Sequence, residues 1–162
     1  MKIKTWKFFQ VFFCCSKTFF KEYEEILKNV KGIISADFNL YRNYSDEVLI
    51  RNCRKNRLVD YALQQVGVPM IPAAGFAGES SWKWCFDSLP KNSTVAVTTN
   101  TLYDKEAKRL FVDGINAMVK KIQPPAIVVC GKCPDWIEKK FSDIQVFEIP
   151  NYSKMWHERK KK

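Results

Sequence analysis

Short runs of β-branched and other apolar residues alternate with amphipathic helical segments along almost the whole chain. The apolar runs cover residues 7–15, 32–38, 68–72, 93–97, 126–130 and 145–149. Strands that alternate with helices are typical of βα units that share a largely parallel sheet. We therefore predict an α/β fold built on an open parallel sheet or a partial (β/α) barrel; the pattern does not fix the order of the strands.

The chain has 162 residues, of which 46% are hydrophobic and 14% are aromatic, so it can bury a substantial core. We predict a single domain over residues 1–152, followed by a basic tail over residues 153–162. The apolar stretch 6–20 is interrupted by Gln10, Ser16 and Lys17 and is too short to span a bilayer. We expect no membrane association and a cytoplasmic location.

The net charge of +10 favours polyanionic partners such as nucleic acid, nucleotides or an anionic surface. Residues 157–162 carry four positive charges and one negative charge, so the remainder of the chain still has a net charge of +7. Within a predicted helix, Arg51, Arg54 and Lys55 share one face, where they could clamp phosphates or simply be solvated. Arg57 lies off this face and is expected to form a partly buried ion pair with Asp37 or Asp60.

Polar side chains follow most of the predicted strands. Because the carboxyl ends of parallel strands meet at one edge of a sheet, we expect these side chains to surround a common crevice. There Asp37 and Glu79 are candidates for a general acid–base pair or for holding a divalent cation. The candidate ligand-binding residues are Asn39, Tyr41, Arg54, Asn56, Arg57, Thr98, Thr99, Asn100 and Lys132. The alternative is that such residues only cap helices and turns.

Cys130-x-x-Cys133-Pro134 follows a predicted strand and opens a helix, a place where a helix N-terminus lowers the pKa of a thiol. The pair comes late in the chain, unlike the early pair of thioredoxin-like folds. A metal site needs two further ligands, and the adjacent Cys14 and Cys15 do not supply a well-spaced pair. The single histidine, His157, excludes histidine-dependent triads, and there is no phosphate-binding glycine loop. We predict incidental cysteines, no metal and no cofactor.

Several segments together resemble an uncharacterised family, a domain of unknown function that is frequent in bacterial phages, prophages and plasmids. They are Ile34–Tyr41, Asn52–Arg57, Ile71–Pro72, Glu79–Pro90 and Thr94–Val97. The similarity covers roughly Phe12 to Gly131. The family's motifs fall on Asp37–Tyr41, with Asn39 in place of serine, on Asn52, Arg54, Asn56 and Arg57, and on Phe86–Pro90, with Ser88 in place of glycine.

Two departures from the family pattern bear on activity. Cys14 and Cys15 stand where the family's first strand ends in an acidic pair, and Phe76 replaces a tryptophan. If the acidic pair serves a metal or a proton transfer, this member has lost that activity and its basic surface serves binding.

Three functions are therefore open. The first is a mobile-element protein that binds nucleic acid or a nucleotide-like ligand. The second is a small enzyme that acts on a phosphorylated or nucleotide substrate at the strand ends. The third is a phage factor that inhibits a host protein through exposed aromatic residues such as Trp82, Trp84 and Trp156.

Overall fold

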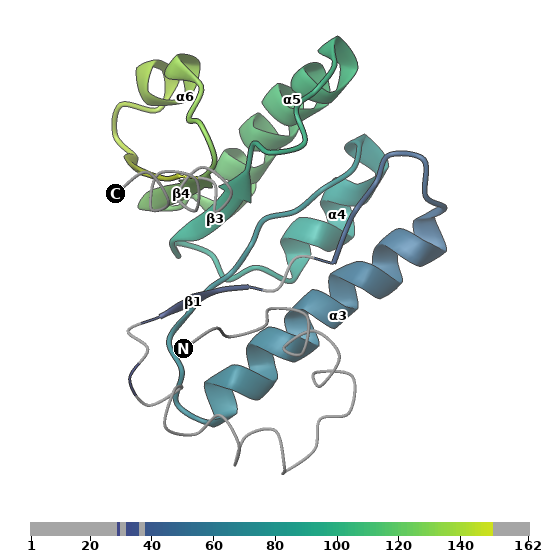
Figure 1. Cartoon of the computed structure of the whole chain (residues 1–162), viewed down its shortest axis with the longest axis vertical. Coiled ribbons are helices and arrows are strands. Elements are labelled where there is room, and N and C mark those ends of the chain that lie inside the picture. The colour runs from purple at the N-terminus through teal and green to yellow at the C-terminus, as the bar shows by residue number, and fades with distance from the viewer. Residues whose placement is uncertain (1–28, 30–31, 36–37, 151–162) are drawn as a thin grey trace, which may run out of the picture.

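The computed structural model describes residue 29, residues 32–35 and residues 38–150 (Figure 1). Within this part, strands and helices alternate as predicted. The elements are β1 (Ile33–Ile34), α3 (Asp46–Gln65), β2 (Met70–Ile71), α4 (Glu79–Asp87), β3 (Val95–Thr98), α5 (Lys105–Ile122), β4 (Ala126–Cys130), α6 (Asp135–Lys140) and β5 (Gln145–Ile149). The predicted strand 7–15, the helix after it and the basic tail lie outside the described residues.

The helix α5 shows how the sequence fixes an element. Asp104 caps it: its side chain accepts a hydrogen bond of 2.7 Å from the backbone N–H of Ala107. Inside the helix, an apolar stripe at helical spacing is buried and includes Phe111, Ile115, Met118 and Ile122. The helix ends at Gln123, whose left-handed backbone (φ 52°) closes the last turn.

The strands lie side by side in the order in which they occur in the chain. β1 pairs with β2, and β3, β4 and β5 form a second group; every pair is parallel. A parallel bridge between Ala73 and Ala96 joins the two groups, since Ala74 N–H donates to the Ala96 carbonyl at 2.7 Å. The described strands thus form an open row and not a closed barrel. Pro69 and Pro72 bracket a strand of two residues, as expected for residues that cannot donate to a ladder.

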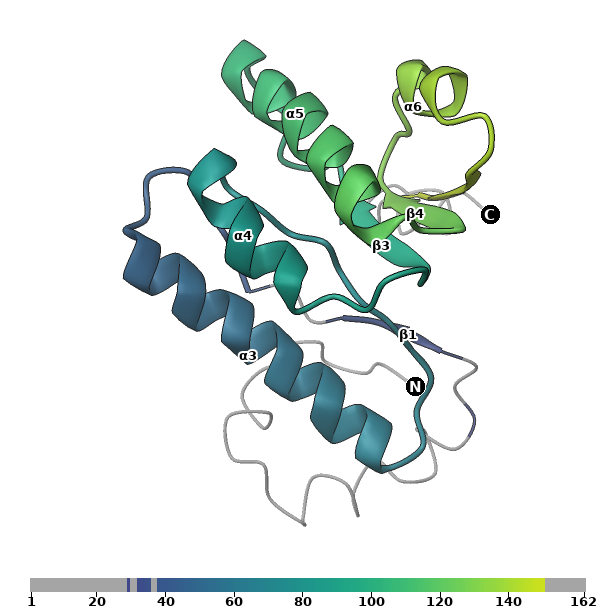
Figure 2. The ribbon, with the colours of Figure 1, turned by 180° about the vertical axis from the view of Figure 1, so that it is seen from behind.

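The described helices pack on one face of this row. Val95 and Val97 of β3 and Ile127 and Val129 of β4 belong to one buried cluster with residues of all four helices. Figure 2 shows α3, α4 and α5 side by side across the strands. Right-handed crossovers between consecutive parallel strands have this result, because each one returns over the same face.

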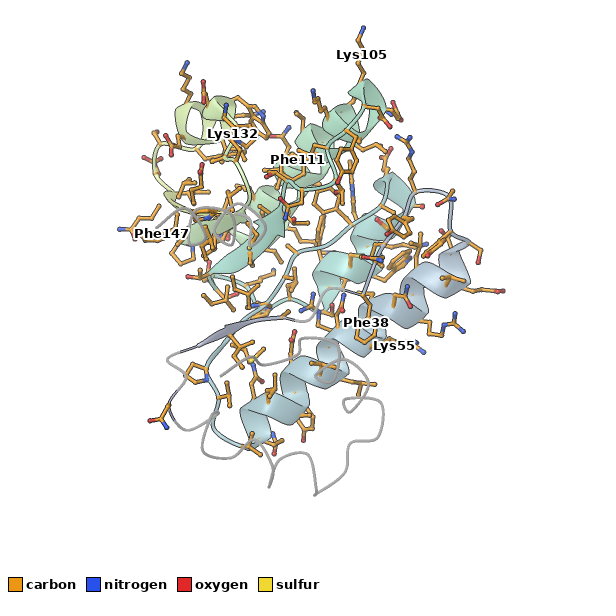
Figure 3. All side chains as sticks on the ribbon, in the orientation of Figure 1. Phe38, Lys55, Lys105, Phe111, Lys132 and Phe147 are labelled. Carbon is orange, nitrogen blue, oxygen red and sulfur yellow. The ribbon has the colours of Figure 1, made fainter. Side chains whose placement is uncertain are left out.

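The alternate residues of the strands point to the other face. Ala96 and Val128, which lie between the residues of the helix-side cluster, are buried. Phe147, the partner of Val128 on β5, remains 52% exposed at the edge of the row (Figure 3). No helix in the described part of the chain is long and apolar enough to cross a membrane.

Candidate ligand-binding site

A cavity of about 600 Å³ opens at the carboxyl ends of β1, β2, β3 and β4. Its buried lining includes Ser35 at the end of β1, Ala74 and Ala77 after β2, Val97 on β3 and Phe111 on α5. This is the edge at which open α/β sheets bind their ligands. As expected from the sequence, the ends of these strands surround a common cavity.

The exposed lining residues form the rim of the cavity. They come from two loops, 38–45 after β1 and 99–104 after β3, and they are Asn39, Tyr41, Arg42, Thr101, Tyr103 and Asp104. Of the predicted site residues, Asn39, Tyr41 and Thr98 line the cavity. Tyr103 and Asp104 were not predicted; Asp104 could have been found as the N-cap that precedes the amphipathic stripe of α5.

Arg42 and Asp104 join the two loops of the rim. The guanidinium donates two hydrogen bonds to the carboxylate, from Nη1 to Oδ1 at 3.0 Å and from Nη2 to Oδ2 at 2.7 Å. This bidentate pair, together with the N–H of Ala107, lowers the pKa of Asp104 to about 2. The rim thus carries an ionised carboxylate and a guanidinium held in a fixed orientation.

The predicted residues on α3 hold the loop after β1. The side-chain oxygen of Asn56, which is buried, accepts a hydrogen bond of 2.8 Å from the backbone N–H of Phe38. One turn earlier, the amide of Asn52 donates to the carbonyl of Asn39 at 2.9 Å. Because both asparagines satisfy backbone groups of the segment that carries Asn39 and Tyr41, they position one side of the rim.

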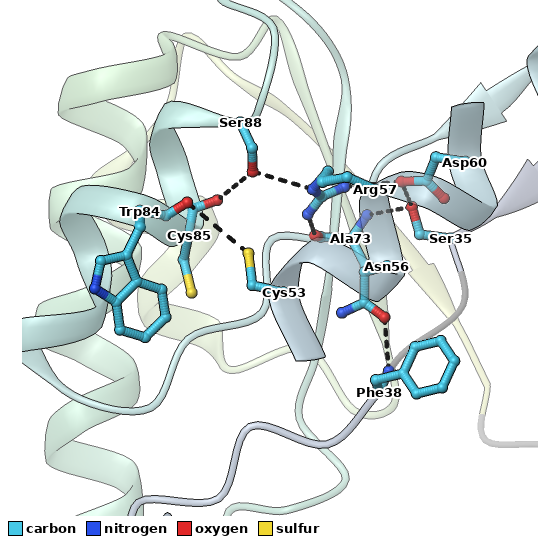
Figure 4. A network of polar contacts seen from close by, with 10 residues as sticks. All are labelled: Ser35, Phe38, Cys53, Asn56, Arg57, Asp60, Ala73, Trp84, Cys85 and Ser88. Atoms are coloured by element: carbon cyan, nitrogen blue, oxygen red, sulfur yellow. Dashed lines mark hydrogen bonds and ion pairs between the residues drawn. The ribbon is translucent and has the colours of Figure 1, made fainter. Parts of the chain in front are cut away.

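A second network links α3 to the ends of β1 and β2 (Figure 4). Arg57 donates to Asp60 at 2.8 Å, to the carbonyl of Ala73 at 2.6 Å and to the hydroxyl of Ser88 at 3.2 Å. Ser35 donates to the same Asp60 oxygen at 2.7 Å and accepts from Ala73 N–H at 3.0 Å. Asp60 is thus the ionic partner of Arg57. These contacts fix the two backbone segments beneath the cavity.

Burial raises the pKa of Asp60, although Ser35 and Arg57 both favour its ionised form. Its other oxygen, Oδ1, is buried and has no hydrogen-bond partner among the described residues. Because one oxygen of the Asp60 carboxylate lacks a hydrogen bond within the described part of the chain, loss of the Arg57 guanidinium should destabilise this network.

Thr98, Thr99 and Asn100 connect the end of β3 to the end of β4. The hydroxyl of Thr98 donates to the carbonyl of Cys130 at 3.3 Å, and that of Thr99 donates to the carbonyl of Lys132 at 3.0 Å. Lys132 itself is exposed and lies outside the lining of the cavity. The side-chain hydroxyls of Thr98 and Thr99 thus donate hydrogen bonds to backbone carbonyls, which agrees with the alternative that such residues cap turns and loops.

Aromatic rings form the apolar floor of the cavity. Phe76 stacks on Phe111 with centroids 6.3 Å apart and meets Phe86 edge-on at 5.6 Å. Its ring lies against Gly114 of α5, where any side chain would overlap it. The hydroxyl of Ser81 accepts a hydrogen bond of 3.1 Å from Ala77 N–H and so holds the loop that carries Phe76.

The remaining predicted residues lie elsewhere. Glu79 is exposed at the first position of α4 and lies outside the cavity lining, and Arg54 is exposed on α3. Asp37, the other candidate catalytic carboxylate, lies outside the described residues. The expectation that Trp82 and Trp84 are exposed is wrong, because both pack half-buried against the core of the helix layer. Trp156 lies outside the described residues.

Among the described residues, Cys53, Cys85 and Cys133 are free thiols. Burial raises the pKa of the Cys133 thiol, and the nearby carboxylates Glu138 and Glu148 raise it further. In the described part of the chain, no group of three or more histidine, cysteine, aspartate or glutamate side chains is placed to hold a metal ion.

Positive charge is unevenly distributed along the chain. Residues 29, 32–35 and 38–150 contain 15 lysines and arginines against 12 aspartates and glutamates, a net charge of +3 out of +10. Around the cavity, Arg42 is matched by Asp104. The described body is therefore only mildly basic, which argues against a broad phosphate-binding face within it.

A family model described as a domain of unknown function (DUF4417) matches residues 7–150. The chain belongs to this family. The resemblance found in the motifs is thereby confirmed, and the motif residues Asn52, Asn56 and Arg57 hold the loops around the cavity.

Two curated relatives are phage proteins. The Gene 1 protein of Mycobacterium phage L5 is 25% identical over 136 residues, which cover 83% of this chain and 57% of the relative. The Gene 1 protein of Mycobacterium phage D29 is 23% identical over 142 residues, covering 85% and 51%. The chain thus spans little more than half the length of these relatives. No solved structure matches it.

Proposed function

We propose that this member of the family binds nucleic acid or a nucleotide-like ligand, and that a nucleotide occupies the cavity at the strand ends. The observation that carries the proposal is the cavity itself. Its volume of about 600 Å³ falls within the range of small-molecule sites. Its place at the carboxyl ends of parallel strands is where folds of this class bind nucleotides.

The lining supports a ligand with one flat apolar part and one polar part. The floor offers the rings of Phe76 and Phe111, against which a base can pack. The rim offers an amide at Asn39, a hydroxyl at Thr101 and the guanidinium of Arg42, which are donors suited to a ribose or a phosphate.

Two further observations favour binding over the other functions. Asp104, the carboxylate among the described lining residues, is held ionised by Arg42 and caps α5, which makes it a poor proton donor at neutral pH. The tryptophans Trp82 and Trp84, which were candidates for docking on a host protein, contribute to the core instead.

Calorimetric titration with nucleoside mono- and triphosphates at 50 and 200 mM salt tests the proposal. Ala107→Leu places a larger side chain in the cavity wall while keeping a good helix former in α5, and it is expected to abolish binding. Lys108→Leu is the matched control, because Lys108 is the exposed neighbour and lies outside the lining. The proposal fails if the wild type binds no nucleotide or nucleic acid at low salt, or if Ala107→Leu binds as the wild type does.

A further inference from the structure

The rim carries tyrosine rings that the cavity does not bury. Tyr103 is 86% exposed, Tyr41 is 47% exposed and Tyr44 is 37% exposed. Tyr44 lies outside the lining and meets Tyr41 edge-on, with ring centroids 5.2 Å apart. A ligand confined to the cavity leaves Tyr44 and much of Tyr103 in water, so these rings offer contact surface beyond a single nucleotide.

The tyrosines stand on two loops that are fixed relative to each other. Tyr41 adjoins Arg42 and Tyr103 adjoins Asp104, and the bidentate pair between Arg42 and Asp104 ties these loops together. The loop of Tyr41 is also held to α3 through Asn52. Rings on such a braced rim lose little freedom when a base stacks on them.

Basic side chains of α3 lie beside the 38–45 loop, which carries Tyr41 and Tyr44. The contact of Asn52 with the carbonyl of Asn39 shows which side of the helix faces the loop. Arg51 and Lys55, one turn apart, share the adjacent face of the helix. The ammonium of Lys55 lies 5.5 Å from the centroid of the Phe38 ring (Figure 3). Arg51 is exposed. A phosphate backbone that leaves the cavity along the 38–45 loop would pass this face of α3.

Building on the proposed function, we infer that the ligand is single-stranded nucleic acid and not a free nucleotide. One nucleotide enters the cavity, the flanking bases stack on the rim tyrosines, and Arg51 and Lys55 contact the backbone. Aromatic platforms beside a basic track are how proteins bind single strands, whose base faces are accessible. A duplex covers those faces, and the described body, with a net charge of +3, offers little to a duplex backbone.

Fluorescence anisotropy tests the inference with three labelled probes: a ten-nucleotide single-stranded DNA, its RNA counterpart and the matching DNA duplex. A nucleoside monophosphate serves as competitor. One of the single strands is expected to bind at least tenfold more tightly than the monophosphate and the duplex. The comparison of DNA with RNA identifies the source of the strand.

Two variants address contacts that only a strand would make. Tyr44→Leu keeps an apolar contact with Tyr41 but removes the ring, and it is expected to weaken strand binding about tenfold, the lower part of the range for one stacked base. Arg51→Gln is expected to reduce the slope of log affinity against log salt by about 0.7, the value for one phosphate contact on a single strand. Tyr61→Leu, at an exposed tyrosine of α3 outside this cavity, is the matched control.

The outcomes separate the two proposals. If the monophosphate binds as tightly as either strand, or if the duplex binds equally well, the inference is overturned while the nucleotide site stands. If Tyr44→Leu and Tyr61→Leu have equal effects, the role given to the rim is overturned. If none of these ligands binds, the proposed function itself fails.

Discussion

Replacing Arg57 with methionine is expected to destabilise the fold. The guanidinium makes three hydrogen bonds, to Asp60, to the Ala73 carbonyl and to Ser88. The Arg57 side chain is 19% exposed and that of Asp60 is 9% exposed, so the pair is largely shielded from water. Methionine retains most of the apolar contact but leaves the Asp60 carboxylate without its cation and the Ala73 carbonyl without its side-chain donor.

Loss of one partner from a buried ion pair costs about 3–5 kcal/mol, and the partial exposure of Arg57 places this case near the lower end, at about 3 kcal/mol. Asp60→Asn removes the buried charge and keeps an acceptor for Ser35 and Arg57, so it is expected to cost about 1 kcal/mol. In the double variant, no unpaired carboxylate remains. Its cost should therefore be smaller than the sum of the two single changes.

The pH dependence of stability gives a second measure of the same network. Because burial raises the pKa of Asp60 above its ordinary value of 3.8, the folded state binds more protons than the unfolded state between these two values. This carboxyl group therefore makes the free energy of unfolding fall as the pH rises through that interval. Asp60→Asn should remove the fall, and Arg57→Met should widen the interval, since an opposing cation is lost.

Urea denaturation followed by tryptophan fluorescence, at several values of pH, measures these quantities. A cost below 1 kcal/mol for Arg57→Met at neutral pH would refute the reasoning. So would additivity in the double variant, because it would mean that Arg57 and Asp60 act independently.

Two further changes follow from the backbone and the rim. Gly131 has φ 115°, and an added methyl group would overlap Thr99, so Gly131→Ala should lower the free energy of unfolding in urea by about 2–3 kcal/mol. Gly67 has φ 80° but open space around it, so Gly67→Ala should lower it by about 1 kcal/mol. Equal costs would show that the contact with Thr99 is unimportant. Arg42 lowers the pKa of Asp104 to about 2. The ionised Asp104 carboxylate therefore contributes to stability above pH 3.8, and this contribution is lost as the pH falls towards 2. Arg42→Gln should begin to lose stability at higher pH in an acid titration by circular dichroism, and an unchanged acid profile would contradict the pair.

Periodicity predicted the elements well where the pattern was long or strongly apolar. The strands 126–130 and 145–149 have the predicted bounds. The predicted strand 32–38 is reduced to Ile33 and Ile34 in the described residues, because Phe38 N–H is bound by Asn56 instead of a neighbouring strand. Alternation alone predicted the parallel sheet but not the order of its strands, which depends on long-range pairing.

The sequence predicts that the candidate site lies at the ends of the strands, but it does not predict which side chains pair with one another there. Sequence reasoning limited the partner of Arg57 to Asp37 or Asp60, since helical spacing brings Asp60 within reach. It did not find the contact of Arg42 with Asp104, because no local period connects residues 62 positions apart. The motif predicts Asn56 as a ligand-binding residue, and the structure shows it bound to the backbone N–H of Phe38, because a polar side chain inside a motif has the same appearance in either role.

The consecutive order of the strands has a consequence for how chains of this family can differ in length. In a row where each strand touches only its neighbours in the sequence, a further βα unit can join at an end without separating any existing pair. Growth of this kind resembles that of repeat proteins, in which each new unit rests on the last. A longer chain could in this way gain whole modules while the pocket between β1 and β4 keeps its walls.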